Sequence, residues 1–241
     1  MTQQAFPAQP ERILVVTAHP DDVDFGAAGS IATWTDQGIQ VSYCIVTDGD
    51  AGGFDEAVTR ADMAVLRREE QTAAAAEVGV TDLHFLGYPD GRLVPSLELR
   101  RDISRVIRQV RPQRVVTQSP QRNWQRIFAS HPDHLATGEA ALCAVYPDSR
   151  NPFAHPELLT EGFEPHTVAE VWLMGGPEPD AVVDVTDNFP RKVAALRRHA
   201  SQVSHREDLE DMLRGWLTTI AKANGLPEGR LAEAFRVVPT A

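Results

Sequence analysis

The chain has 241 residues, of which 42% are hydrophobic and 24% are charged, a composition typical of folded globular proteins. Its formal net charge of -11 disfavours nucleic acid and anionic membranes as partners, because both repel an acidic surface. Residues 1–10 lack the basic and apolar regions of a secretory signal, and no apolar run of about 18 residues follows. We therefore expect a cytoplasmic protein without membrane insertion or a nucleic-acid partner; the sequence leaves homo-oligomer formation open.

Strands and helices alternate through the first half of the chain. A β-branched run predicts a buried strand over 13–17, and the next segments predict a helix over 29–37 and a strand over 40–46. The alternation continues with two more helices and two more strands, predicted over 61–78, 83–86, 97–110 and 114–118. This order predicts parallel strand pairs, and hence an α/β, Rossmann-like sheet that is mostly parallel and flanked by helices.

The second half of the chain has a less regular pattern. After a helix that ends near Val145 and a Pro-rich segment, strands over 167–173 and 181–185 are expected to form a hairpin at the sheet edge. Helices are predicted over 189–201, 207–223 and 228–235, and the last two form a C-terminal cap. We expect one domain over 1–241, with its core over 11–202 and a C-terminal helical extension over 203–241.

A string of potential metal ligands, Ala18-His-Pro-Asp-Asp-Val-Asp24, directly follows the first predicted strand. Imidazole and carboxylate are both good Zn²⁺ ligands, and one His and one Asp close in sequence can chelate one ion. If Asp22 binds the metal together with His19, Asp21 is left to act as general base on the attacking water. The alternative interpretation is a structural turn, for which His-Pro-Asp is also typical.

A second string, His131-Pro-Asp-His134, lies between a predicted strand and a predicted helix. His134 would complete the set of three protein ligands that a catalytic zinc usually takes, with one position left for water or substrate. His131 is then available to protonate the leaving amine or to stabilise the tetrahedral oxyanion, and Asp133 to fix an imidazole tautomer. Both strings follow strands, so they are expected to meet at the carboxyl edge of the sheet.

Together the two strings resemble the LmbE-like superfamily of N-acetylglucosaminylphosphatidylinositol (PIG-L) and N-acetylglucosaminyl deacetylases, over about residues 13–201. The resemblance implies a Rossmann-like fold, a single Zn²⁺, and Asp21 as the general base. It assigns the metal ligands to His19, Asp22 and His134, and the superfamily's other histidine to His131.

The resemblance extends to the segment Arg67-Arg-Glu-Glu70, which matches an Arg-x-x-Glu pattern of the superfamily. It implies that Arg67 holds substrate hydroxyls, while the alternative for this segment is a solvated helix face. The chain departs from the superfamily at Ala129, where some members carry a Tyr that stabilises the tetrahedral intermediate. Candidates to replace that Tyr are Trp124, Arg126 and Tyr146, and the sequence does not choose among them.

These features predict a zinc-dependent amidase that removes the N-acetyl group from a small molecule containing N-acetylglucosamine. A second interpretation keeps the chemistry but changes the substrate to a thiol-cofactor pseudo-disaccharide or its S-conjugate. A third, a nucleotide-binding module, is disfavoured because no Gly-x-Gly-x-x-Gly follows the first strand. The paired aspartates would also repel a phosphate at that position.

Overall fold

The computed structural model describes residues 9–240. The expectation that no secretory signal is present concerns residues 1–10, and most of these lie outside the described residues. The cytoplasmic location therefore stays a prediction. Within the described part of the chain, no helix has both the length and the apolar character needed to cross a bilayer.

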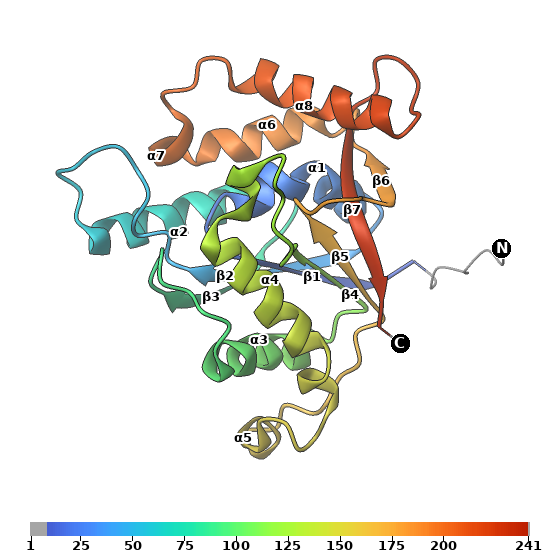
Figure 1. Ribbon diagram of the computed structural model, residues 1–241. Coiled ribbons are helices and arrows are strands. Elements are labelled where there is room, and N and C mark those ends of the chain that lie inside the picture. The colour runs from blue at the N-terminus through green and yellow to red at the C-terminus, as the bar shows by residue number, and fades with distance from the viewer. Residues whose placement is uncertain (1–8, 241) are drawn as a thin grey trace.

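The fold is built on one seven-stranded sheet, in the order β3-β2-β1-β4-β5-β7-β6 (Figure 1). Strands β3, β2, β1, β4 and β5 are parallel. At the β6 edge of the sheet, β7 pairs antiparallel with both β5 and β6. The strands are β1 (Arg12–Thr17), β2 (Gln40–Thr47), β3 (Asp82–Tyr88), β4 (Arg114–Gln118), β5 (Glu170–Met174), β6 (Ala181–Asp184) and β7 (Ala232–Pro239). The predicted α/β class with a mostly parallel sheet is confirmed.

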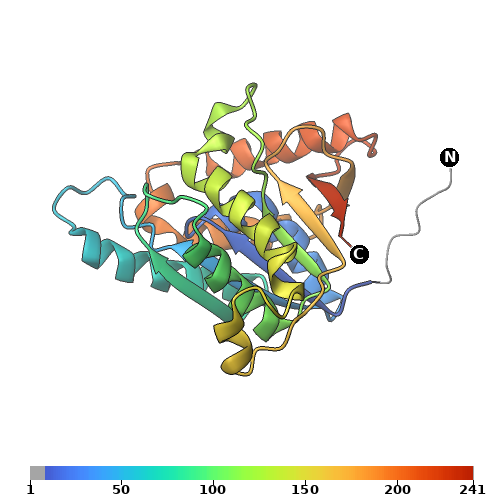
Figure 2. The same ribbon diagram turned by 60° about the horizontal axis from the view of Figure 1, so that its bottom comes forward.

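Helices cover both faces of the sheet. The longer ones are α1 (Asp22–Asp36), α2 (Arg60–Glu77), α3 (Leu97–Val110), α4 (Pro132–Val145), α6 (Phe189–Arg198) and α8 (Leu209–Ala223), and the short ones are α5 (Pro156–Thr160) and α7 (Ala200–Val203). Helices α1, α2 and α6 pack on one face, with α8 outside α6, and Figure 2 shows α3 and α4 on the other face.

Alternate residues of β1 enter two different cores. Ile13 and Val15 pack with α1 and α2, whereas Leu14 and Val16 pack with α3 and α4, and all four are fully buried. This alternation is the two-residue side-chain period of a strand that is covered on both faces. It explains why the first strand was predictable from its continuous apolar run.

The C-terminal elements differ from the prediction. The segment 228–235, expected to be helical, contributes to β7, which pairs with both β5 and β6. The expected hairpin between those two strands is therefore wrong, and the extension 203–241 is not wholly helical. Alanine and glutamate favour helix locally, but burial of Phe235 against Trp34 and Trp172 outweighs that preference.

Two helix boundaries also differ from the prediction. The helix expected over 189–201 ends at Arg198, and a separate turn, α7, follows His199. Helix α1 begins at Asp22 rather than at residue 29, so the first motif enters its first turn. Glycine at 26 and 29 lowers helix propensity, but these positions face close neighbours and need to be small.

Replacing Gly29 by Ala is expected to lower the free energy of unfolding by about 1–3 kcal/mol, the usual cost of overpacking. A Cβ at this position would lie 2.7 Å from Cβ of Val185. Urea unfolding would measure the change. Gly215→Ala, in α8, is the matched control, because its Cβ would meet no atom within 4 Å and should stabilise that helix slightly. Equal stability of the two variants would contradict this account of the packing.

Candidate active site

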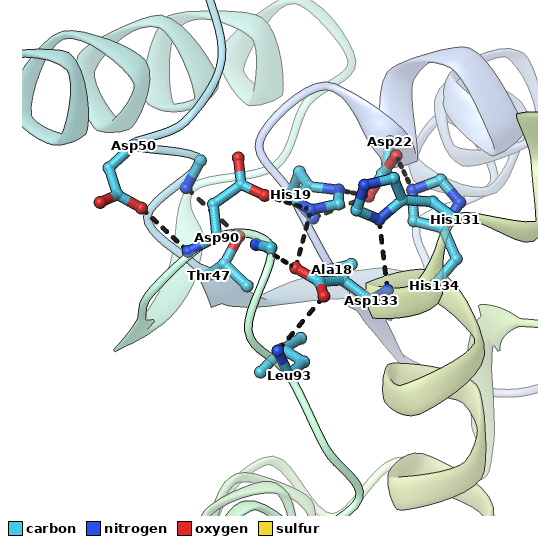
Figure 3. Close-up of polar contacts among 12 residues, drawn as sticks. Ala18, His19, Asp22, Thr47, Asp50, Asp90, Leu93, His131, Asp133 and His134 are labelled. Carbon is cyan, nitrogen blue, oxygen red and sulfur yellow. Dashed lines mark hydrogen bonds and ion pairs between the residues drawn. The ribbon is translucent and has the colours of Figure 1, made fainter. Parts of the chain in front are cut away.

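Both motifs lie at the carboxyl edge of the sheet, as expected (Figure 3). His19 follows β1, and Asp22 opens α1. His134 lies in the first turn of α4, shortly after the loop that leaves β4. The parallel pairing of β1 with β4 brings these two loops side by side, although the motifs are more than a hundred residues apart in the sequence.

The three residues predicted to bind metal converge through the Asp22 carboxylate. Its Oδ2 lies 3.2 Å from His19 Nδ1, and its Oδ1 lies 3.0 Å from His134 Nε2. The same Oδ2 accepts hydrogen bonds from the His19 backbone N–H at 2.7 Å and from Gln118 Nε2 at 2.9 Å. These bonds hold the carboxylate between the two imidazoles, the arrangement expected of ligands around one ion.

The second nitrogen of His19 faces two more carboxylates. Its Nε2 lies 3.0 Å from Asp90 Oδ1 and 3.3 Å from Asp133 Oδ2. Because ionised carboxylates only accept hydrogen bonds, Nε2 is assigned the proton and Nδ1 the lone pair of the neutral ring. That lone pair points at an Asp22 oxygen, and two such atoms repel unless a cation or a proton lies between them.

The charges around His19 therefore fit a cation. Burial alone would lower the pKa of His19, but the charge of Asp22 and the hydrogen bonds that Asp133, Asp22 and Asp90 accept from the ring raise it to about 12. So many carboxylates around one imidazole need compensation by positive charge. A divalent ion held by His19, Asp22 and His134 would supply that charge. His131 also has a ring nitrogen within 4.8 Å of nitrogens of His19 and His134.

Asp21 has an uncommon backbone conformation, with φ 94°, at the N-cap of α1. A positive φ in a residue other than Gly is strained and must be held by neighbouring contacts. Its backbone N–H donates to Gln71 Oε1 at 2.9 Å, and its carboxylate accepts from Arg67 Nη2 at 2.9 Å. Burial raises the pKa of Asp21 to about 6 even though the charge of Arg67 lowers it. A carboxylate with such a pKa is suited to take up a proton near neutral pH.

Arg67 is directed inward from α2 and is only 3% exposed. Besides Asp21, its guanidinium donates to the backbone oxygens of Gly49, at 3.0 Å, and Pro20. Glu70 is also buried and accepts two hydrogen bonds from Ser201. The solvated-face alternative is therefore wrong for Arg67 and Glu70. The structure shows Arg67 holding Asp21; contact with substrate hydroxyls stays a prediction.

His131 and Asp133 have different surroundings. The Nδ1 of His131 accepts the Asp133 backbone N–H at 3.2 Å, so a neutral His131 carries its proton on Nε2. Burial, together with the charges of His19 and His134, lowers the pKa of His131, which favours this neutral form. The Asp133 carboxylate accepts N–H groups of Gly91 and Leu93 and contacts His19. The imidazole that Asp133 contacts is thus that of His19, not that of His131.

Comparison with known proteins gives the family. The sequence model described as GlcNAc-PI de-N-acetylase (PIG-L) matches residues 14–145, which contain both motifs. The chain belongs to the PIG-L family. The resemblance seen in the two motifs is thereby confirmed.

Relatives in the PIG-L family are named as deacetylases. The chain is 34% identical over 230 residues to the diacetylchitobiose deacetylase of Thermococcus kodakarensis, covering 95% of this chain and 84% of that protein. It is 33% identical over 197 residues to a probable N-acetyl-alpha-D-glucosaminyl L-malate deacetylase 2 of Bacillus cereus, covering 79% and 83%. The structure of N,N'-diacetylchitobiose deacetylase from Pyrococcus horikoshii superimposes with a TM-score of 0.87 at 31% identity, covering 95% of this chain and 84% of that one.

Four side chains of this PIG-L member that were not assigned a site role from the sequence support the site. Asp90, which follows β3, contacts His19 through Oδ1 at 3.0 Å. Gln71 joins the Asp21 backbone to Asp24, whose Oδ2 it contacts through Nε2 at 2.9 Å. The same Asp24 oxygen lies 2.8 Å from Nε2 of His199, which is fully buried. The position of Asp90 after a predicted strand could have indicated that it lies near the site. No feature of the sequence indicates such a position for Gln71.

Replacing Gln71 by Leu is expected to lower the free energy of unfolding by about 1–3 kcal/mol, because a buried carboxylate and an N–H each lose a partner. It should also lower kcat, since the Asp21 backbone loses the bond that holds its strained conformation. Urea unfolding and steady-state kinetics at a temperature where the variant is folded separate the two effects. Thr72→Val is the control, because Thr72 lies next to Gln71 on the exposed face of α2. Unchanged kcat would show that Asp21 does not depend on this bond.

A cavity of about 780 Å³ opens beside the predicted metal ligands. Asp22 and His134 line it, and other parts of its wall come from the loop after β4, the turn after β5, and α8. Ala129 lines the cavity, and of the three residues considered as replacements for the missing Tyr, only Arg126 does so. A cavity of this size is typical of small-molecule sites, which measure about 300–1,000 Å³.

Proposed function

We propose that the protein is a zinc-dependent amide hydrolase that removes the N-acetyl group from a small molecule containing N-acetylglucosamine. The observation that carries this proposal is the convergence of His19, Asp22 and His134, two of which, Asp22 and His134, line a cavity. Two His and one carboxylate form a common ligand set for catalytic zinc. The names of the relatives support the choice of an N-acetylated amino sugar as substrate.

When bound, zinc supplies Lewis acidity toward the acetyl carbonyl and toward the attacking water. Asp21 takes the proton of that water, and Arg67 keeps the Asp21 carboxylate in place. The Nε2–H of neutral His131, whose Nδ1 accepts the Asp133 N–H, donates to the developing oxyanion. The C–N bond then breaks, and the amine leaves with a proton from Asp21 or from His131. The products are acetate and a free amino sugar.

A substrate panel tests the proposal. We expect acetate release from N-acetylglucosamine glycosides such as diacetylchitobiose, accompanied by one new primary amine for each acetate. A thiol pseudo-disaccharide bearing N-acetylglucosamine, and its S-conjugate, form the second arm, because the same residues would serve that alternative. Release only in the second arm would change the assigned substrate, and release in neither arm by zinc-loaded protein would overturn the proposal.

A further inference from the structure

Part of the cavity wall is built from aromatic and cationic side chains. The rings of Phe128, from the loop after β4, and Trp216, from α8, lie nearly parallel at 15° with centroids 6.2 Å apart. The guanidinium carbon of Arg126 lies 4.7 Å from the Trp216 centroid and 5.1 Å from that of Phe128. Contacts with two rings limit the freedom of the Arg126 side chain, so its guanidinium is held in place before a ligand arrives.

Two arginines of this cavity have no carboxylate partner. Arg126 and Arg206 both line it, and within residues 9–240 neither forms an ion pair. The polar side-chain contact of Arg206 is with Met212 Sδ, at 3.5 Å. By contrast, Arg60 and Arg68 on the opposite side of the site are paired with Asp50 and Asp48.

The carboxylates that line the cavity do not neutralise these arginines. Asp22 belongs to the metal site, and Glu233 is buried in an ion pair with Lys192 at 2.7 Å. Glu178 is the remaining acidic residue of the wall. Away from the metal site, the cavity therefore presents two unpaired guanidinium groups and one carboxylate.

We propose that this part of the cavity binds an anionic group, a carboxylate or a phosphate, carried by the aglycone of the N-acetylglucosaminide, and that Arg126 selects such substrates. The inference rests on the proposed function, which places the acetamide at the metal ligands and directs the rest of the substrate along the cavity. Arg126 offers a planar set of donors that matches a carboxylate or a phosphate, and Arg206 adds a second positive charge. Substrates with neutral aglycones, diacetylchitobiose among them, lack a group for this site.

The test compares N-acetylglucosaminides that differ only in one aglycone substituent: a carboxylate, its methyl ester, and a phosphate monoester. We expect kcat/KM for the carboxylate or the phosphate to exceed that for the ester by about 10- to 100-fold, the range given by a charge-assisted hydrogen bond. The better of the two anions identifies the substituent. In Arg126→Met the ratio of kcat/KM for the better anion to kcat/KM for the ester should fall toward one. Arg126→Lys should keep part of this preference.

Arg122→Met is the matched control, because Arg122 lies in the same loop, over the exposed ring of Trp124, and does not line the cavity. It should keep the full preference for the anion. Equal kcat/KM for the ester and both anions, with acetate released from all three, would overturn the inference while leaving the proposed function intact. An anion preference that persists undiminished in Arg126→Met would also overturn the assigned role. Absence of release from all three substrates would remove both proposals together.

Discussion

Replacing Asp21 by Asn is expected to lower kcat by about 10²- to 10⁴-fold, the usual contribution of a general base. Asparagine has nearly the same shape and can still accept a hydrogen bond from Arg67, which contacts Asp21 Oδ2 in the structure. It cannot take up a proton from the attacking water. Zinc content should stay at the wild-type level, because Asp21 is not one of the three proposed ligands. Acetate release under saturating substrate, with elemental analysis of the same sample, measures both quantities.

A matched substitution controls for the loss of one negative charge near the site. Asp48→Asn removes a carboxylate that is paired with the exposed Arg68 at 3.1 Å and contacts none of the proposed ligands. Its kcat should stay within a few-fold of wild type. Near wild-type turnover by Asp21→Asn would contradict the general-base role, and loss of zinc from that variant would mean that Asp21 acts on the metal site instead.

Replacing Asp22 by Ala is expected to abolish zinc binding at micromolar concentrations and, with it, turnover. Asp22 lies between His19 Nδ1 and His134 Nε2 and is the only carboxylate proposed as a ligand. Its removal should weaken zinc binding by more than the roughly 10- to 100-fold that loss of an outer-shell partner costs. Competition with a chromogenic chelator measures the affinity of the folded variant.

The control for Asp22→Ala is Asp36→Ala, at the other end of the same helix, where the carboxylate pairs with Arg191. That variant should bind zinc as the wild type does. If Asp22→Ala kept wild-type zinc affinity, the ion would have to be held elsewhere. The alternative sets of ligands would then be His19 with His131 and His134, or His19 with Asp90 and Asp133.

The central part of the site was predictable because its residues are close together in the sequence. His19, Asp21 and Asp22 lie in one short string after a strand, and His131 and His134 lie in another. Chemistry and strand position then suffice to bring them together, since parallel strands share one carboxyl edge. The order of strands and helices in the first half followed from apolar runs that are buried on both faces of the sheet.

The residues that support the site were harder to predict because their partners are distant in sequence. Gln71 contacts the Asp21 backbone from α2, and Asp90 reaches His19 from beyond β3, which lies two strands away from β1. For Arg67, the resemblance implied a role at the site, but the neighbouring Arg68 and the acidic residues after it left a solvated helix face as the alternative. Strand β7 was missed because its pairing with β5 and β6, not its local sequence, determines its conformation.

The most direct test of the proposed function is to titrate chelator-treated protein with zinc while measuring acetate release from diacetylchitobiose or from an anionic N-acetylglucosaminide. We predict no release from the metal-free protein, and a rise that reaches its plateau at one zinc per chain. His134→Ala, which lacks one proposed ligand, should show neither tight zinc binding nor this rise. Full turnover by protein shown to contain no metal would contradict the proposed function. So would a plateau of acetate release that His134→Ala reaches at the same ratio of zinc to chain.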